Sequence, residues 1–222
     1  MTAHMWPVHL GGWAPRQCDE HSCGPAALLM LAASGDGTLA SWLNGGSADD
    51  ASCPPEVPAW AWHRELPVAT RHEVTQRHIA ELLRRSADGQ RNRLAWPHQW
   101  GTTPSAAARV ARFGPAEYEA LWLTRKRTER LTRLVEAVTT AATPCLLYVG
   151  GDPSQSAHRR LPRHVVLAVP GRSARSDVIN IFDPGSAMLT EVPVAELDDN
   201  RSKAAFGGWA RPYAVVVPKN PK

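Results

Sequence analysis

The residues best suited to chemistry lie near the N-terminus, where residues 17–25 have the sequence QCDEHSCGP. An apolar stretch, Ala26–Ala33, follows directly, and Pro25 suits the first turn of a helix. We therefore expect a short buried helix over Cys23–Ser34. Unpaired backbone N–H groups and the helix dipole favour negative charge at its N-terminus, and this stabilises the nucleophilic thiolate form of Cys23.

A cysteine that attacks a carbonyl also needs donors for the oxyanion that forms. Gln17 stands six residues before Cys23, and its side-chain amide could donate to that oxyanion beside the backbone N–H of Cys23. Gly24 lets backbone or substrate approach closely. The segment therefore predicts a cysteine nucleophile with Gln17 as an oxyanion donor.

Among the nine histidines, His164 is the best candidate for the base that activates this thiol. It stands directly before an apolar strand, Val165–Val169, and a polar loop leads to a second strand, Val178–Phe182, that is followed by Asp183. The two strands are expected to form an antiparallel hairpin. His158, in the loop before the first strand, is a rival base without an evident acidic partner.

The hairpin also predicts which carboxylate orients the imidazole. If Val169 pairs with Val178, His164 faces Asp183 in the same ladder, and directly opposed residues have Cβ atoms about 4.5 to 5.5 Å apart. A carboxylate at that distance can hold an imidazole in place. Cys23, His164 and Asp183 are thus the predicted nucleophile, base and orienting group.

These residues carry a resemblance to a known family. The order Gln17, Cys23-Gly24-Pro25-Ala26, His164-Val165-Val166 and Asp183-Pro184 resembles the bacteriocin-processing cysteine peptidases, family 39 of the cysteine peptidases, and especially their stand-alone relatives with a papain-like fold. The resemblance spans most of the chain and implies an oxyanion-supporting glutamine and a Cys-His-Asp triad. Those roles fall on Gln17, Cys23, His164 and Asp183.

The same resemblance extends to Gly101-Thr102-Thr103-Pro104, which is similar to a Gly-Thr-x-Pro segment found between the two halves of such proteins. The chain departs from the family at Ser22, where members often have Asp directly before the nucleophile. Nothing in the sequence resembles the membrane and ATPase portions of the transporter-linked leader peptidases. Cleavage of double-glycine leaders is therefore not inferred.

The composition along the chain indicates the elements that position these residues. We expect an α+β, papain-like single domain, 1–222, in which 1–142 form a mainly helical lobe and 143–222 a mainly β lobe. Besides the helix at Cys23, the expected helices are Glu73–Arg85, a helix from the Thr103-Pro104 cap through Phe113, and Thr128–Ala141, with Gly45–Pro67 as a long surface connection. The expected strands, in one mostly antiparallel sheet, are Cys145–Val149, Val165–Val169, Val178–Phe182 and Tyr213–Val217.

The overall composition excludes several classes of protein. The chain has 222 residues, 43% of them apolar, and a net charge of +4 from 25 Lys and Arg against 21 Asp and Glu. The basic residues lie in mixed-charge helical stretches without interleaved aromatic residues, so nucleic acid is not an expected partner. Apolar runs such as Ala26–Ala33 are far shorter than the roughly 20 residues of a membrane span. We expect a soluble protein, cytoplasmic or exported by a route without a recognisable signal peptide.

Four cysteines are too few for a disulfide scaffold, so reduced thiols are expected. Cys18, His21, Cys23 and Cys53 could alternatively supply zinc ligands, but their spacings are irregular and form no Cys-x-x-Cys knuckle. Cys18 is otherwise a structural thiol or a redox partner of Cys23 or Cys53, and Cys145 is expected in the core. The mechanism predicted here needs no metal and no organic cofactor.

The predicted function is a thiol hydrolase that cleaves a peptide, isopeptide or amide bond of a peptide or protein substrate through a thioester intermediate. One alternative is an acyl or amide transferase with the same triad, because only the access of water to the thioester separates the two reactions. Another alternative is a binding module without catalysis, which an unreactive Cys23 would favour.

Overall fold

The computed structural model describes residues 5–48, 52–85, 101–124, 126–152, 162–171 and 177–219. Its helices are α1 (Cys23–Gly35), α2 (Gly37–Leu43), α3 (Ala59–Trp62), α4 (Val68–Arg84), α5 (Pro104–Val110) and α6 (Arg127–Thr139). Its strands are β1 (Met5–Pro7), β2 (Tyr118–Trp122), β3 (Cys145–Gly150), β4 (Pro162–Val169), β5 (Val178–Asp183), β6 (Met188–Pro193) and β7 (Arg211–Pro218). Two short 3-10 helices, η2 (Val194–Glu196) and η3 (Asn200–Ala204), precede β7. The expected α+β class is confirmed.

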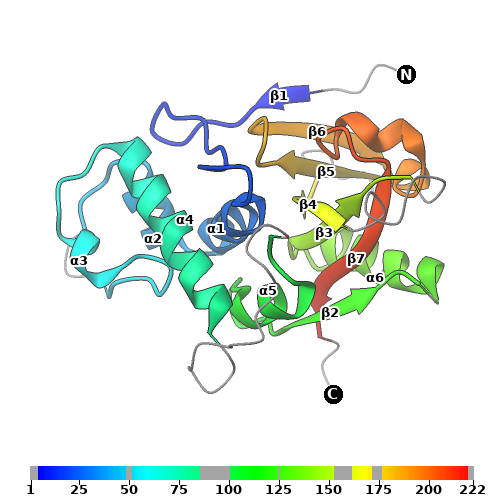
Figure 1. The fold of residues 1–222 in the computed structure, drawn as a ribbon, viewed down its shortest axis with the longest axis horizontal. Coiled ribbons are helices and arrows are strands. Elements are labelled where there is room, and N and C mark those ends of the chain that lie inside the picture. Colours follow the sequence, from blue (N-terminus) through cyan, green and yellow to red (C-terminus); the bar gives the residue numbers. More distant parts are fainter. Residues whose placement is uncertain are drawn as a thin grey trace.

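All seven strands form one antiparallel sheet in the order β1-β6-β5-β4-β3-β7-β2 (Figure 1). The strands β3, β4, β5 and β7 are the ones expected from their apolar, β-branched sequences. The sheet also contains β1, β2 and β6, which the sequence analysis did not predict. Two of these, β1 and β2, are its edges, so the N-terminal part of the chain contributes to the sheet.

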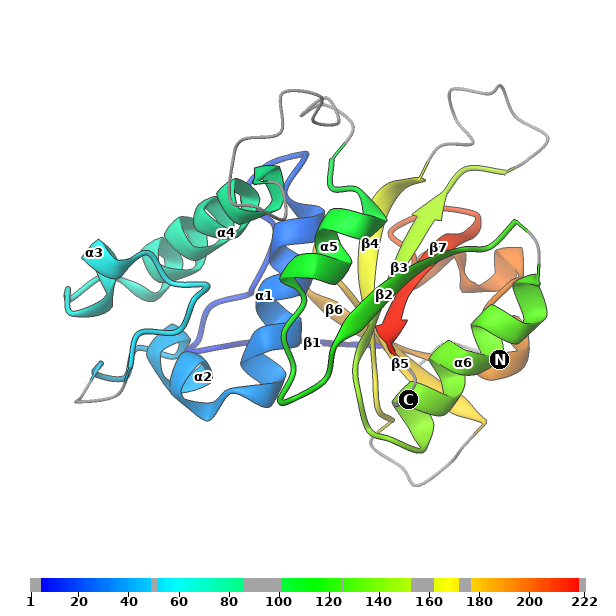
Figure 2. The same cartoon turned by 90° about the horizontal axis from the view of Figure 1, so that it is seen from below.

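Helices cover both faces of the sheet (Figure 2). On one face, α1 and its neighbouring helices bury a core that includes Leu28 and Trp42 against alternate sheet residues such as Leu167. On the other face, α6 buries Leu134 and Val138 against the intervening strand residues, whose side chains point to this second face. Of the helices described, α6 is therefore set apart from the group around α1, although it precedes most of the sheet in the sequence.

The helix that carries the predicted nucleophile is the most deeply buried of the described helices. Ten of the residues in α1 are buried, as its apolar sequence predicts, and it packs directly on β4. The expected start at Cys23 is confirmed, and the helix ends at Gly35. The cap of α5 is also as expected, because the Thr103 side chain accepts a hydrogen bond from the Ala106 N–H and Pro104 opens the first turn.

Some helix boundaries differ from the expectation. The fourth helix begins at Val68, earlier than the expected Glu73, with Pro67 as its N-cap residue. The fifth helix ends at Val110, short of the expected Phe113. The connection Gly45–Pro67 is not wholly a surface segment, since it contains α3 and the buried side chain of Trp62.

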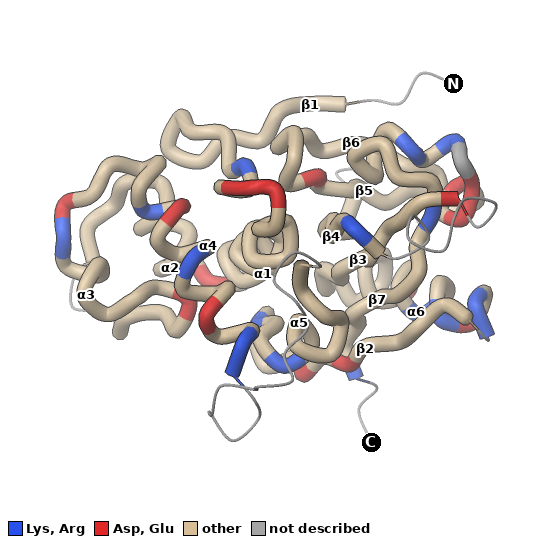
Figure 3. The backbone as a smooth tube through the Cα atoms, in the orientation of Figure 1, with Lys and Arg blue, Asp and Glu red and all other residues tan. Residues whose placement is uncertain are grey.

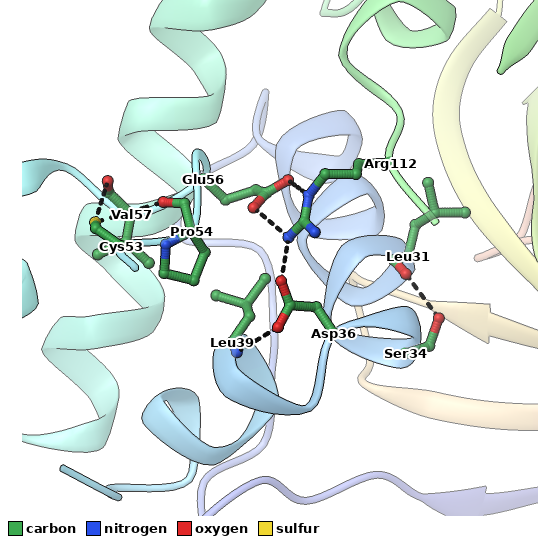
Figure 4. A network of polar contacts seen from close by, with 9 residues as sticks. All are labelled: Leu31, Ser34, Asp36, Leu39, Cys53, Pro54, Glu56, Val57 and Arg112. Carbon is green, nitrogen blue, oxygen red and sulfur yellow. Dashed lines mark hydrogen bonds and ion pairs between the residues drawn. The ribbon is translucent and has the colours of Figure 1, made fainter. Parts of the chain in front are cut away.

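A partly buried ion-pair network fixes the corner between α1 and α2 (Figure 4). Arg112 donates two hydrogen bonds to the Glu56 carboxylate, both 2.8 Å long, and approaches an Asp36 oxygen at 2.8 Å. Asp36 also caps α2 by accepting a hydrogen bond from the Leu39 N–H. Because Glu56 is buried, this pairing is needed to satisfy its charge. The network joins the loop after α5 to the C-terminal end of α1.

Lys and Arg residues are interspersed with Asp and Glu residues along the described backbone (Figure 3). Among the described residues, no helix combines the length and apolar character that crossing a membrane requires.

Candidate active site

Cys23 lies at the first position of α1, with Ser22 as the N-cap residue. The helix starts there because the Ser22 carbonyl accepts a hydrogen bond from the Ala26 N–H at 2.9 Å. The Ser22 hydroxyl does not cap the helix but accepts a hydrogen bond from the Asp19 N–H, which closes the preceding turn. Cys23 is 4% exposed. The predicted setting of Cys23, at the N-terminus of a buried helix, is confirmed.

His164 contacts Asp183 directly, as predicted. The imidazole Nε2 lies 2.6 Å from Asp183 Oδ1, and both side chains are buried. The register that led to this prediction is wrong. Val169 pairs with Asn180, not with Val178, so Asp183 lies diagonally across from His164 rather than opposite it.

His164 and Asp183 still meet because the observed register differs from the expected one by two residues. A shift of two keeps each side chain on the same face of a sheet, whereas a shift of one would reverse it. Diagonal neighbours also remain within reach of long side chains such as His. Because β5 pairs along its whole length with β6 but through only three residues with β4, Val178 and Ile179, which were expected opposite β4, pair with β6 instead.

The turn after β5 fixes the Asp183 carboxylate. Oδ1 accepts a hydrogen bond from the Gly185 N–H at 2.9 Å, and Oδ2 accepts one from the Ser186 hydroxyl at 2.7 Å. The Ser186 N–H is also within hydrogen-bond distance of Oδ2, at 3.2 Å. The carboxylate is thus held from its own turn while one oxygen faces His164. Sequence analysis did not identify Ser186, although Asp-Pro-Gly-Ser is a typical sequence for a turn in which the Asp side chain accepts backbone N–H groups.

Electrostatics favour an ionised His164. Burial alone lowers the pKa of the imidazole, but hydrogen bonds to Asp183 and Cys23, together with the charges of these two groups, raise the pKa of His164 to about 9. Burial likewise acts to raise the pKa of Asp183, but the hydrogen bonds from His164, Ser186 and Gly185 outweigh it and lower this pKa below its ordinary value. Both directions describe an imidazolium paired with a carboxylate. Since Nε2 faces Asp183, Nδ1 is the ring nitrogen left for the Cys23 thiol.

Gln17 contacts the turn that follows Asp183. Its backbone N–H donates to the Pro184 carbonyl at 2.9 Å, which ties the segment before α1 to the turn after β5. Its side-chain amide donates to the Asp19 carbonyl at 2.8 Å. An NH₂ group has two protons, so one donor remains for the predicted oxyanion role.

The segment Gly101-Thr102-Thr103-Pro104 forms a second boundary of the site. A Cβ atom on Gly24 would lie 2.4 Å from Thr102 Oγ1, so the backbone after Cys23 and the Thr102 side chain are in close contact. The Thr103 carbonyl accepts a hydrogen bond from the Tyr148 hydroxyl at 3.2 Å. Burial first, and then the charge of Cys23, raise the pKa of Tyr148 well above its ordinary value. No sequence signal marked Tyr148, which lies within an ordinary apolar strand.

All four cysteines are free thiols. Cys18 is exposed, Cys145 is buried in the core as expected, and Cys53 is partly buried. No three His, Cys, Asp or Glu side chains among the described residues are grouped so that they could hold a metal ion, and Cys18, His21, Cys23 and Cys53 are all within that part of the chain. The rival base His158 lies outside the described residues.

Comparison of the chain with models of known protein families gives no match, and a comparison with curated protein sequences gives none either.

Proposed function

We propose that the protein is a thiol hydrolase that cleaves a peptide, isopeptide or other amide bond of a peptide or protein substrate. The observation that supports this most strongly is the 2.6 Å contact between His164 Nε2 and the Asp183 carboxylate. A hydrogen bond to the Cys23 side chain, and the charge of that side chain, also raise the pKa of the same imidazole. A cysteine at a helix N-terminus, next to an oriented and ionised histidine, has the features of an activated nucleophile.

In the proposed reaction the Cys23 thiolate attacks the carbonyl carbon of the scissile amide, and a C–S bond forms. The negative charge that develops on the carbonyl oxygen is stabilised by the Cys23 backbone N–H and by the free proton of the Gln17 amide. The C–N bond then breaks, and the His164 imidazolium gives its proton to the leaving amine. Neutral His164 next takes a proton from water, whose oxygen attacks the thioester carbonyl carbon and forms a C–O bond. The C–S bond then breaks, the carboxylic acid product leaves, and the Cys23 thiolate and the His164 imidazolium are restored.

The architecture is consistent with a papain-like arrangement of the kind found in the family 39 cysteine peptidases. The nucleophile is on a buried helix of one layer, and its two partners are on adjacent strands of the antiparallel sheet against which that helix packs. The glutamine six residues before the nucleophile is the fourth element of the resemblance, and its backbone contact with Pro184 places it at the same end of the sheet.

Trapping of the thioester tests this function directly. We expect that incubation with a library of short acetylated peptide amides, followed by an acid quench, leaves an acyl adduct on Cys23 that mass spectrometry detects and hydroxylamine removes. Cys23→Ala should form no adduct, and Cys18→Ala, the matched change at a second thiol of the same loop, should retain it. Adducts that are distributed equally over the thiols, or that persist in Cys23→Ala, would contradict the proposal.

A further inference from the structure

Gly207 lies directly over the His164–Asp183 pair. A Cβ atom at this position would be 3.0 Å from His164 Nε2, 3.1 Å from His164 Cδ2 and 3.4 Å from Asp183 Oδ1. These are the two atoms, Nε2 and Oδ1, that form the 2.6 Å contact. Gly207 itself is exposed, whereas the side chains that it covers are only 10% and 8% exposed. This exposed glycine therefore lies close beside a buried contact.

The segment that carries Gly207 has little freedom to move away. Phe206, the preceding residue, is fully buried in the core between the sheet and α6. On the other side, the Gly208 N–H donates to the Lys203 carbonyl and the Ala210 N–H donates to the Gly150 carbonyl, both at 2.9 Å. Gly207 has a φ of +61°, in the left-handed region where a side chain adds strain. The close approach is therefore held from both sides.

We propose that Gly207 is a positioning residue: the absence of a side chain lets its backbone close over the His164–Asp183 hydrogen bond and keep water away from it. Water competes for both partners of an exposed hydrogen bond, and an ion pair that is screened from water is stronger than an exposed one. The importance of Gly207 for catalysis rests on the proposed function. The exclusion of water from the His164–Asp183 hydrogen bond does not, because it involves only these two side chains and Gly207.

The chain offers a matched control for testing the shield. Gly208, the next residue, also has a positive φ, +90°, but a Cβ atom there meets nothing within 4 Å. Gly208→Ala therefore adds the same methyl group and at least as much backbone strain without touching the pair. The test compares Gly207→Ala and Gly208→Ala by NMR titration of the His164 ring and by the pH dependence of Cys23 alkylation with iodoacetamide.

In Gly207→Ala the added methyl group should displace the ring or the carboxylate, and the titration midpoint of His164 should fall by at least about one pH unit. Gly208→Ala should titrate like the wild-type protein. The same midpoint in both variants would overturn the proposal. Neither readout uses a substrate, so a shifted midpoint without any thioester on Cys23 would refute the proposed function and leave the role of Gly207 standing.

A measurement on the wild-type protein covers the case in which Gly207→Ala does not fold. A ring N–H that is shielded from water exchanges slowly, so the Nε2 proton of His164 should give a resolved signal in water near neutral pH. The exposed His63 provides the comparison, because its ring protons should exchange too fast to be seen. Exchange of the His164 proton as fast as that of His63 would overturn the proposal.

Discussion

Replacing Asp183 with Asn removes one negative charge from the His164 imidazole while the shape of the side chain is retained. The pKa of His164 is about 9 because the hydrogen bonds to Asp183 and Cys23 and the charges of both groups outweigh the effect of burial, which acts in the opposite direction. In Asp183→Asn the charge of the carboxylate is lost, whereas burial and the contributions of Cys23 remain. We therefore expect the pKa of His164 to fall towards its ordinary value of about 6.5.

This fall gives a loss of reactivity that depends on pH. At pH 7.5 a histidine with a pKa of about 9 is almost fully protonated, whereas one with a pKa of about 6.5 is roughly one-tenth protonated. If the imidazolium holds the Cys23 thiolate, the alkylation rate should fall about tenfold at pH 7.5 but less than about twofold at pH 6. His164→Ala should cause a larger loss, because it removes the proton carrier altogether.

The assay is the rate of Cys23 alkylation by iodoacetamide, followed by peptide mass spectrometry between pH 6 and pH 9, and it needs no substrate. Asp198→Asn is the matched control, since Asp198 forms an ion pair with Arg127 away from the site. Asp183→Asn with wild-type rates throughout, or with an equal loss at every pH, would refute the reasoning, because neither result can come from a lowered pKa of His164.

Three further changes test other parts of the account. Gln17→Ala should lower turnover of a peptide substrate about 10²- to 10³-fold and leave Cys23 alkylation intact, and wild-type turnover would show that Gln17 is only structural. The Cβ atom added in Gly24→Ala would lie 2.4 Å from Thr102 Oγ1, so this change should reduce the free energy of unfolding by about 1 to 3 kcal/mol. Gly37→Ala, the control, adds a Cβ atom in open space and should not reduce it. Equal effects of the two changes would argue against the contact between Gly24 and Thr102. Burial lowers the pKa of His72 to about 4, so protonating this side chain disfavours the folded state. The free energy of unfolding should therefore be unaffected above about pH 6.5 and should fall by roughly 3 kcal/mol in total as the pH drops from there through about 4. Urea unfolding at pH 7 and pH 4.5 should show His72→Leu to be less acid-sensitive than the wild-type protein, and an equal sensitivity would contradict this.

The parts of the fold that could be predicted are those fixed by local sequence. Pro25 and the apolar run after it were sufficient for α1, and Thr103 with Pro104 marked the start of α5. The unpredicted strands depend on their partners. β1 has three residues and ends at Pro7, and β2 alternates weakly and contains Glu and Ala, which have low strand propensity. These segments are strands because they extend the edges of a sheet that is already formed.

The candidate site, like the fold, could be predicted only in part. The residue types and their order along the chain indicated Cys23, His164 and Asp183 as candidates, but the register of the hairpin could not be obtained from two strands alone. β5 pairs with β6 along its full length, and this third strand was not visible in the sequence. The close approach at Gly24 was expected, but its partner Thr102 and the role of Gly207 were not predictable, because each depends on a side chain from a distant segment near the position of the missing Cβ atom.

The central claim is that the surroundings of Cys23, and not its accessibility, make it the reactive thiol. Cys18 is exposed, whereas Cys23 is 4% exposed, so accessibility alone predicts that Cys18 reacts first. Burial raises the pKa of Cys18, Cys53 and Cys145 above the ordinary value, which leaves these thiols protonated at pH 6. The most direct measurement is therefore the rate of iodoacetamide alkylation of each of the four thiols in the folded protein at pH 6. Our account predicts that Cys23 is modified far faster than the other three, and it would be contradicted if Cys18 reacted as fast as Cys23 or faster.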